Sequence, residues 1–126
     1  MERVTGIGGV FFRSARPDAL RRWYAEHLGL EVEDWGGAVL TAAGGETLTW
    51  SVFDAGTDYF GPSGQQLMVN YRVADLDAML AQLRDAGVPV DERVAESEHG
   101  RFGWATDPEG NRLELWQPPA GDYPGD

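Results

Sequence analysis

The sequence predicts an α+β fold in which a β-α-β-β-β unit occurs twice. Two amphipathic helical segments each follow an apolar run with strand character. Residues 9–24 correspond in spacing to residues 68–83, so that Arg13 matches Arg72. Short strand-like pieces follow each helical segment. Because each unit alone is too small to enclose a core, we expect one domain over residues 1–117, with module 1 at 4–54 and module 2 at 66–117.

Module 1 begins with an apolar strand-like run and continues into a helix. The helix begins near Pro17, whose fixed φ angle suits a first helical position, and Gly29 ends it. One apolar stripe along this helix consists of Leu20, Trp23, Tyr24 and Leu28. Glycine-rich turns then separate strand-like pieces at about 31–35, 38–42 and 47–53.

Module 2 repeats this order after the linker. Asp75 is a good N-cap, and Gly87 and Pro89 end the second helix. Helical spacing is shown by Leu76, Met79, Leu80 and Leu83. The strand-like pieces that follow lie at about 92–96, 101–106 and 112–117.

Two non-repetitive segments flank module 2. The inter-module loop, residues 55–65, carries the adjacent aromatic residues Tyr59 and Phe60. Solvated linkers rarely contain such pairs, so we expect this loop to pack on the rim of a pocket or on a partner subunit. The tail at 118–126 has no periodicity and is expected to be flexible.

Composition excludes several classes of partner and chemistry. The 126 residues contain 10 Lys+Arg, 21 Asp+Glu and no cysteine, which gives a net charge of −11. Without cysteine there can be no disulfide, thiolate zinc site or cysteine nucleophile, and a cytoplasmic location is the default. The negative charge argues against nucleic acid and membrane partners, since phosphate contacts require Lys or Arg. No apolar stretch approaches the roughly 18 residues of a membrane span.

Three segments carry a resemblance to a known superfamily. They are residues 23–30 (WYAEHLGL), 70–77 (NYRVADLD) and above all 100–116 (GRFGWATDPEGNRLELW). Together with the doubled β-α-β-β-β order, they resemble the vicinal oxygen chelate superfamily of glyoxalase I, bleomycin-resistance proteins and extradiol dioxygenases. The resemblance covers nearly all of the chain up to Gln117. It implies a glyoxalase-like fold, in which two βαβββ modules form facing curved sheets around a cavity, and usually a homodimer.

Enzymes of this superfamily hold a divalent metal with one side chain from each of four strands. The resemblance places these positions at Gly9, Thr49, Met68 and Glu114. Only Glu114 is a good ligand for a hard cation, because glycine has no donor and a thioether is soft. We therefore expect no catalytic metal and no cofactor.

The two histidines do not supply a replacement. His27 lies near the end of the first helix, where a positive charge interacts favourably with the helix dipole. His99 lies in an acidic loop. A structural or solvated role is expected for both.

Strand alternation predicts which side chains share the cavity with Glu114. Leu113 and Leu115 should face the helices, so Glu114 faces inward as the candidate catalytic residue. The expected ligand-binding residues are Phe11, Thr49, Ser51, Phe53, Met68, Asn70, Arg72, Arg112 and Trp116. This mixture of apolar surface and a few polar groups is typical of a small-molecule pocket. Two alternatives are a cavity filled by its own aromatic residues and a structural ion pair of Glu114 with Arg112, Arg72 or Arg13.

These observations leave three functions open. The first is an enzyme acting on a small oxygen-rich metabolite, with Glu114 as general acid or base. The second is a protein that sequesters a drug-like or secondary metabolite between aromatic walls, as bleomycin-resistance proteins do. The third, a metal-dependent lyase or dioxygenase, is disfavoured by the missing ligands. A small-molecule partner and a homodimer are expected in each case, the latter also because Tyr59 and Phe60 are apolar for a linker.

Overall fold

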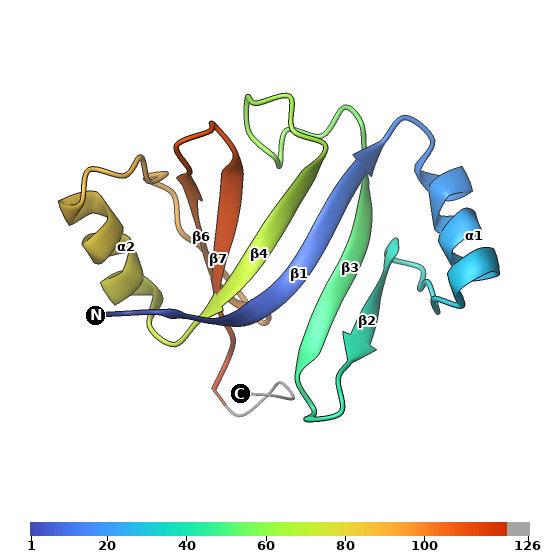
Figure 1. The fold of residues 1–126 in the computed structure, drawn as a ribbon, viewed down its shortest axis with the longest axis horizontal. Coiled ribbons are helices and arrows are strands. Elements are labelled where there is room, and N and C mark those ends of the chain that lie inside the picture. Colours follow the sequence, from blue (N-terminus) through green and yellow to red (C-terminus); the bar gives the residue numbers. More distant parts are fainter. Residues whose placement is uncertain (121–126) are drawn as a thin grey trace.

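The computed structural model describes residues 1–120 and confirms the duplicated α+β architecture (Figure 1). Module 1 consists of β1 (Val4–Ser14), α1 (Pro17–Leu28), β2 (Gly37–Thr41) and β3 (Thr47–Asp54). Module 2 consists of β4 (Leu67–Val73), α2 (Leu76–Asp85), β5 (Ala95–Ser97), β6 (Gly100–Thr106) and β7 (Arg112–Gln117). Most of the tail for which flexibility was predicted, residues 121–126, lies outside the described residues.

The two modules join edge to edge in one curled seven-stranded sheet of order β2-β3-β1-β4-β7-β6-β5. The antiparallel pair of β1 and β4 forms the central seam. Within each module the first strand runs parallel to the last, as β1 with β3 and β4 with β7. Figure 1 shows α1 and α2 at opposite ends of this sheet.

Strand register places both helices on the same face of the sheet. Trp50 of β3 packs with residues of α1 such as Leu20 and Tyr24. In the sheet, Trp50 pairs with Val10 of β1, and Val10 pairs with Val69 of β4. Val69 shares its side of β4 with Val73, which packs against α2. The opposite face, here called the inner face, carries the alternate residues of each strand.

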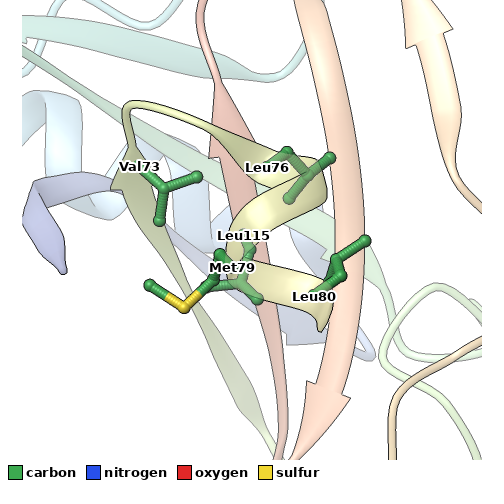
Figure 2. Packing of buried hydrophobic residues seen from close by; sticks show 5 residues of the cluster. All are labelled: Val73, Leu76, Met79, Leu80 and Leu115. Carbon is green, nitrogen blue, oxygen red and sulfur yellow. The ribbon is translucent and has the colours of Figure 1, made fainter. Parts of the chain in front are cut away.

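Helix α2 is fixed by a core of aliphatic side chains. Leu76, Met79 and Leu80 pack on Val73 and Leu115, as Figure 2 shows. The predicted N-cap is confirmed, since the Asp75 carboxylate accepts a hydrogen bond of 3.0 Å from the backbone N of Ala78. Because Leu115 belongs to this core, its side chain points toward the helix layer, as predicted.

Helix α1 packs more loosely. None of its residues is fully buried, although Leu20 and Tyr24 lie against Trp50 and Val52. It begins at Pro17 and ends at Gly29, which adopts the left-handed conformation with φ 70° as predicted.

Two predicted strands differ in the structure. Residues 31–35 form no strand, because a turn closes there: the backbone N of Gly36 donates to the carbonyl of Glu33 at 3.0 Å. The side chain of Trp35 folds onto Gly37, where any Cβ would clash with it. The strand expected at 92–96 is shorter and shifted, at Ala95–Ser97, and Val90 instead forms an isolated bridge with Ala105.

Candidate functional site

Glu114 lies at the centre of the inner face, in the middle of β7. The register sets it directly beside Asn70 of β4 and Trp104 of β6. Directly paired residues project to the same face, so all three side chains meet there. Glu114 is 1% exposed and is the only buried carboxylate among residues 1–120, so it needs local partners.

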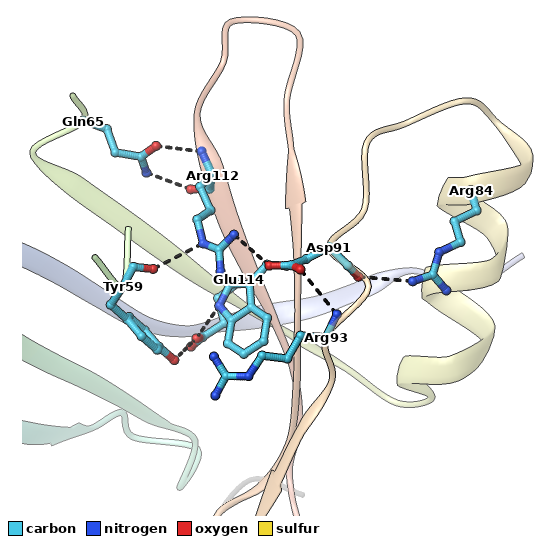
Figure 3. A network of polar contacts seen from close by, with 8 residues as sticks. Tyr59, Gln65, Arg84, Asp91, Arg93, Arg112 and Glu114 are labelled. Atoms are coloured by element: carbon cyan, nitrogen blue, oxygen red, sulfur yellow. Dashed lines mark hydrogen bonds and ion pairs between the residues drawn. The ribbon is translucent and has the colours of Figure 1, made fainter. Parts of the chain in front are cut away.

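Three side chains donate hydrogen bonds to the Glu114 carboxylate, and Figure 3 labels one of them, Tyr59. The Asn70 Nδ2 donates to Oε1 at 2.6 Å, and the Trp104 Nε1 donates to Oε2 at 2.9 Å. The Tyr59 hydroxyl also donates to Oε2. Burial raises the pKa of Glu114, and the hydrogen bonds from Tyr59, Asn70 and Trp104 oppose this rise without cancelling it. The pKa of Tyr59 is also raised, first by burial and then by the neighbouring Glu114.

The inter-module loop covers this site. The Tyr59 ring stacks on Phe53, with centroids 5.4 Å apart and planes 7° apart, and meets Trp104 edge-on at 6.0 Å. Phe60 is 0% exposed and packs with Phe11, Met68 and Trp104. The loop therefore packs on the inner face of its own chain. Since both aromatic residues are covered by their own chain, they no longer argue for a partner subunit.

Arg112 and Gln65 anchor the loop to β7. Gln65 holds the backbone of Arg112, accepting from its N at 2.7 Å and donating to its O at 2.8 Å. The Arg112 guanidinium donates to the Tyr59 carbonyl at 3.2 Å and pairs with Asp91, N to O, at 3.1 Å. Arg112 therefore positions the loop that brings Tyr59 to Glu114.

The other predicted site residues fall into two groups on the inner face. Phe11 and Met68 are buried in the aromatic cluster with Phe60 and Trp104. The protein's own aromatic side chains therefore fill this half of the inner face. Arg72 and Trp116 lie one step toward the other end of the strands, with the guanidinium 5.3 Å from the ring centroid.

Thr49 and Ser51 belong to β3, which is separated from β7 and Glu114 by strands β1 and β4. Thr49 pairs with Gly9, and Ser51 pairs with Phe11 and is 7% exposed. Neither residue makes a hydrogen bond to Glu114 in the structure. The ion-pair alternative for Glu114 is not seen, since no ion pair among residues 1–120 includes it.

Sequence reasoning missed Trp104 and Tyr59 as partners of Glu114. The position of Trp104 could have been predicted, because the turn at 107–111 fixes the β6–β7 register. This register pairs Trp104 with Glu114. No periodicity governs the loop, so nothing in the sequence specified that Tyr59 would reach Glu114.

The residues at the family's four metal positions do not fit a metal ion. Gly9 has no side chain, and Met68 is 1% exposed among aromatic rings. Both Glu114 oxygens face N–H or O–H donors, which occupy the directions a cation would need. In the described part of the chain no three His, Cys, Asp or Glu side chains gather as a possible metal site.

The fold and the family match place the protein in the vicinal oxygen chelate superfamily. Within it, the chain belongs to the glyoxalase-like domain family, whose model matches residues 9–116. A comparison with functionally curated proteins found no match. Across residues 1–120, no helix is long and apolar enough to cross a membrane.

Similar solved structures include two methylmalonyl-CoA epimerases. The epimerase from Mycobacterium tuberculosis is 27% identical, with a TM-score of 0.63 over 92% of this chain and 89% of that one. An epimerase bound to methylmalonyl-CoA and NH4+ is 21% identical, with a TM-score of 0.71 over 97% of this chain and 100% of that one. A Mn(II)-bound glyoxalase from Novosphingobium aromaticivorans is 21% identical, with a TM-score of 0.63 over 93% of this chain and 40% of that one. At 21% identity the likeness shows a shared fold.

Proposed function

We propose that this protein binds a small metabolite on the inner face and transfers a proton to or from it with Glu114, without the superfamily's metal centre. One observation carries the proposal. The sheet holds a carboxylate that is 1% exposed in an aromatic surround and hydrogen-bonded to a tyrosine from the covering loop. Buried carboxylates with a raised pKa are suited to exchanging protons near neutral pH.

The arrangement gives the loop a role in access. Tyr59 and Trp104 both donate to one Glu114 oxygen, and Asn70 donates to the other. A ligand atom can reach the carboxylate only by displacing one of these donors. Tyr59 is the one that sits on a loop rather than on a strand, so movement of this loop would expose Glu114.

The similar structures support proton transfer as the chemistry. Two of them are named methylmalonyl-CoA epimerases, one of which is 27% identical to this chain. Epimerisation removes a proton from a carbon centre and returns it to the opposite face, a reaction that acid–base side chains carry out.

Sequestration without turnover is the second candidate. Stacked aromatic pairs lie on both sides of the site: Phe53 with Tyr59 at 5.4 Å and Phe102 with Trp116 at 6.2 Å between centroids. Such surfaces can hold a planar ligand by stacking alone.

The test begins with the ligand that the purified protein retains, identified by mass spectrometry together with elemental analysis of the same sample. Binding and turnover of that ligand are then compared between the wild type and Glu114→Gln. The variant should fold, because rotation of the Asn70 amide would turn its unpaired Oδ1 toward the new Gln amide.

Proton transfer predicts that Glu114→Gln lowers turnover and largely keeps binding, whereas charge pairing in a sequestering protein predicts weaker binding. Chelation should change neither quantity. One tightly bound Zn²⁺, Mn²⁺ or Fe²⁺ per chain in this site would contradict the proposal, as would a Glu114→Gln variant with unchanged binding and turnover.

Assembly and location are part of the same proposal. Ile7 and Leu67, on the helix-bearing face, are 39% and 44% exposed and offer an apolar surface for a second copy. Light scattering should therefore give the mass of a homodimer, and a monomer at micromolar concentration would contradict it. A cytoplasmic location stays a prediction.

A further inference from the structure

We infer that Arg93 anchors a negatively charged group, a carboxylate or a phosphate, of the small molecule that binds beside Glu114. This inference rests on the proposed function and deepens it by naming the class of ligand. It follows from where Arg93 lies, from the absence of an ion-pair partner for its guanidinium within residues 1–120 and from the charges around it.

Arg93 lies at the edge of the inner face. The segment before β5 runs along β6, with the backbone N of Asp91 donating to the carbonyl of Trp104 at 2.9 Å. From this segment the Arg93 guanidinium reaches over the Trp104 ring, 5.4 Å from its centroid. That same ring donates its N–H to Glu114. In Figure 3 the guanidinium end of Arg93 is directed toward the Tyr59 hydroxyl.

The two neighbouring arginines have polar partners for their guanidinium groups, and Arg93 has none among residues 1–120. Arg112 pairs with Asp91 and donates to the Tyr59 carbonyl, while Arg84 donates to the Asp91 carbonyl at 3.1 Å. Within residues 1–120 the Arg93 guanidinium makes no hydrogen bond or ion pair, and only its backbone N contacts Asp91. Its side chain remains exposed at the edge of the site.

No ion pair within residues 1–120 includes Arg93, although the chain is strongly acidic. The protein has 21 acidic residues against 10 basic ones. Arg101, by comparison, pairs with both Asp77 and Glu96. A guanidinium without a carboxylate partner, beside a covered site, is a ready donor for a planar anion.

The charges around the site favour an anion as well. Arg93 and Arg112 supply two positive charges, and Asp91 offsets one of them. Burial raises the pKa of Glu114, and three side-chain donors offset its charge. Arg93 also acts on Tyr59, where its charge opposes the rise in the hydroxyl pKa. The site is thus less negative than the whole chain, whose net charge is −11.

The experiment titrates the full chain with sodium malonate and, separately, with sodium phosphate, and follows the NMR signal of the Trp104 indole N–H. Sodium chloride at equal ionic strength controls for screening. We expect a saturable shift in the wild type and a dissociation constant raised about tenfold or more in Arg93→Gln. Arg93→Lys, which keeps the charge and loses the fork of donors, should bind with intermediate affinity.

Arg22→Gln is the matched control, because Arg22 is an exposed arginine of α1. Its affinity should equal that of the wild type, and unfolding midpoints should show that all variants are folded. The inference is overturned if the wild type shows no saturable shift, or if Arg93→Gln binds both anions as the wild type does. In the second case Arg93 serves to cover Trp104.

Failure of this inference can be told apart from failure of the proposed function. If Arg93→Gln binds the anions normally while Glu114→Gln still impairs binding or turnover of the retained ligand, only the anion anchor is wrong. If anion binding depends on Arg93 and Glu114→Gln changes nothing, only the role of Glu114 is wrong.

Discussion

Tyr59→Phe removes one hydrogen bond to Glu114 and leaves the ring that covers the site in place. The ring stacks on Phe53 with planes 7° apart, and this contact does not involve the hydroxyl. The hydroxyl donates to a carboxylate that is 1% exposed, where water cannot easily replace it. The variant therefore isolates the electrostatic contribution of Tyr59 from its packing.

The magnitude follows from the kind of bond. A hydrogen bond to a charged group contributes about 1.5–3 kcal/mol, and a neutral one about 0.5–1.5 kcal/mol. The Tyr59 hydrogen bond lowers the pKa of Glu114, so its loss should raise that pKa further. The loss of stability should accordingly be larger at a pH where Glu114 is ionised than at a pH where it is protonated.

Two measurements test this reasoning. The 13C shift of the Glu114 carboxyl, followed against pH, gives the pKa directly, and urea unfolding at several pH values gives the free energy of unfolding. Tyr71→Phe is the control, since the Tyr71 hydroxyl makes no hydrogen bond in the part of the chain described. An unchanged Glu114 pKa in Tyr59→Phe, together with an unchanged free energy of unfolding, would refute the claim that Tyr59 holds the carboxylate.

Three further results are expected. Phe60→Ala should lower the free energy of unfolding by about 3–5 kcal/mol, because Phe60 is 0% exposed. Leu28→Ala, at a 64% exposed site, should change it little. Urea titration measures both, and equal losses would mean that the loop is not part of the core. Gly8→Ala should destabilise by about 1–3 kcal/mol in thermal unfolding, because its Cβ would lie 2.4 Å from Asn70 Oδ1, while Gly44→Ala meets no atom within 4 Å and should be neutral. In the wild type the free energy of unfolding should fall by up to about 1.4 kcal/mol per pH unit as the pH rises from the unfolded pKa of Glu114, near 4.3, to its higher folded pKa. Glu114→Gln should abolish this fall. Parallel pH profiles of variant and wild type would contradict the raised pKa.

The parts of the fold that follow a regular period could be predicted from the sequence. Both helices begin and end at the expected residues, and alternation along β7 correctly placed Glu114 opposite to Leu115. The strand expected at 31–35 was wrong because apolar alternation there coincides with a turn that Gly36 closes with φ 99°. Short segments beside glycines have too few residues for the pattern to outweigh the turn.

The site could be predicted only as far as strand geometry determines it. Glu114 and Asn70 were expected on one face, and they meet there at 2.6 Å. The contributions of Tyr59 and Arg93 come from irregular segments, whose course depends on packing and on side-chain bonds such as those of Gln65 to Arg112. Such contacts join residues far apart in the sequence and leave no local signature.

The central seam has a consequence for how the chain is made. β1 is synthesised before both of its partners, β3, about 40 residues later, and β4, about 60 residues later. Until residues 67–73 have been synthesised, β1 keeps at least one open edge, and that edge carries apolar residues such as Val10 and Phe12. The nascent first module is therefore the species most exposed to intermolecular strand pairing, and a fragment that ends at Asp54 should aggregate where the full chain does not.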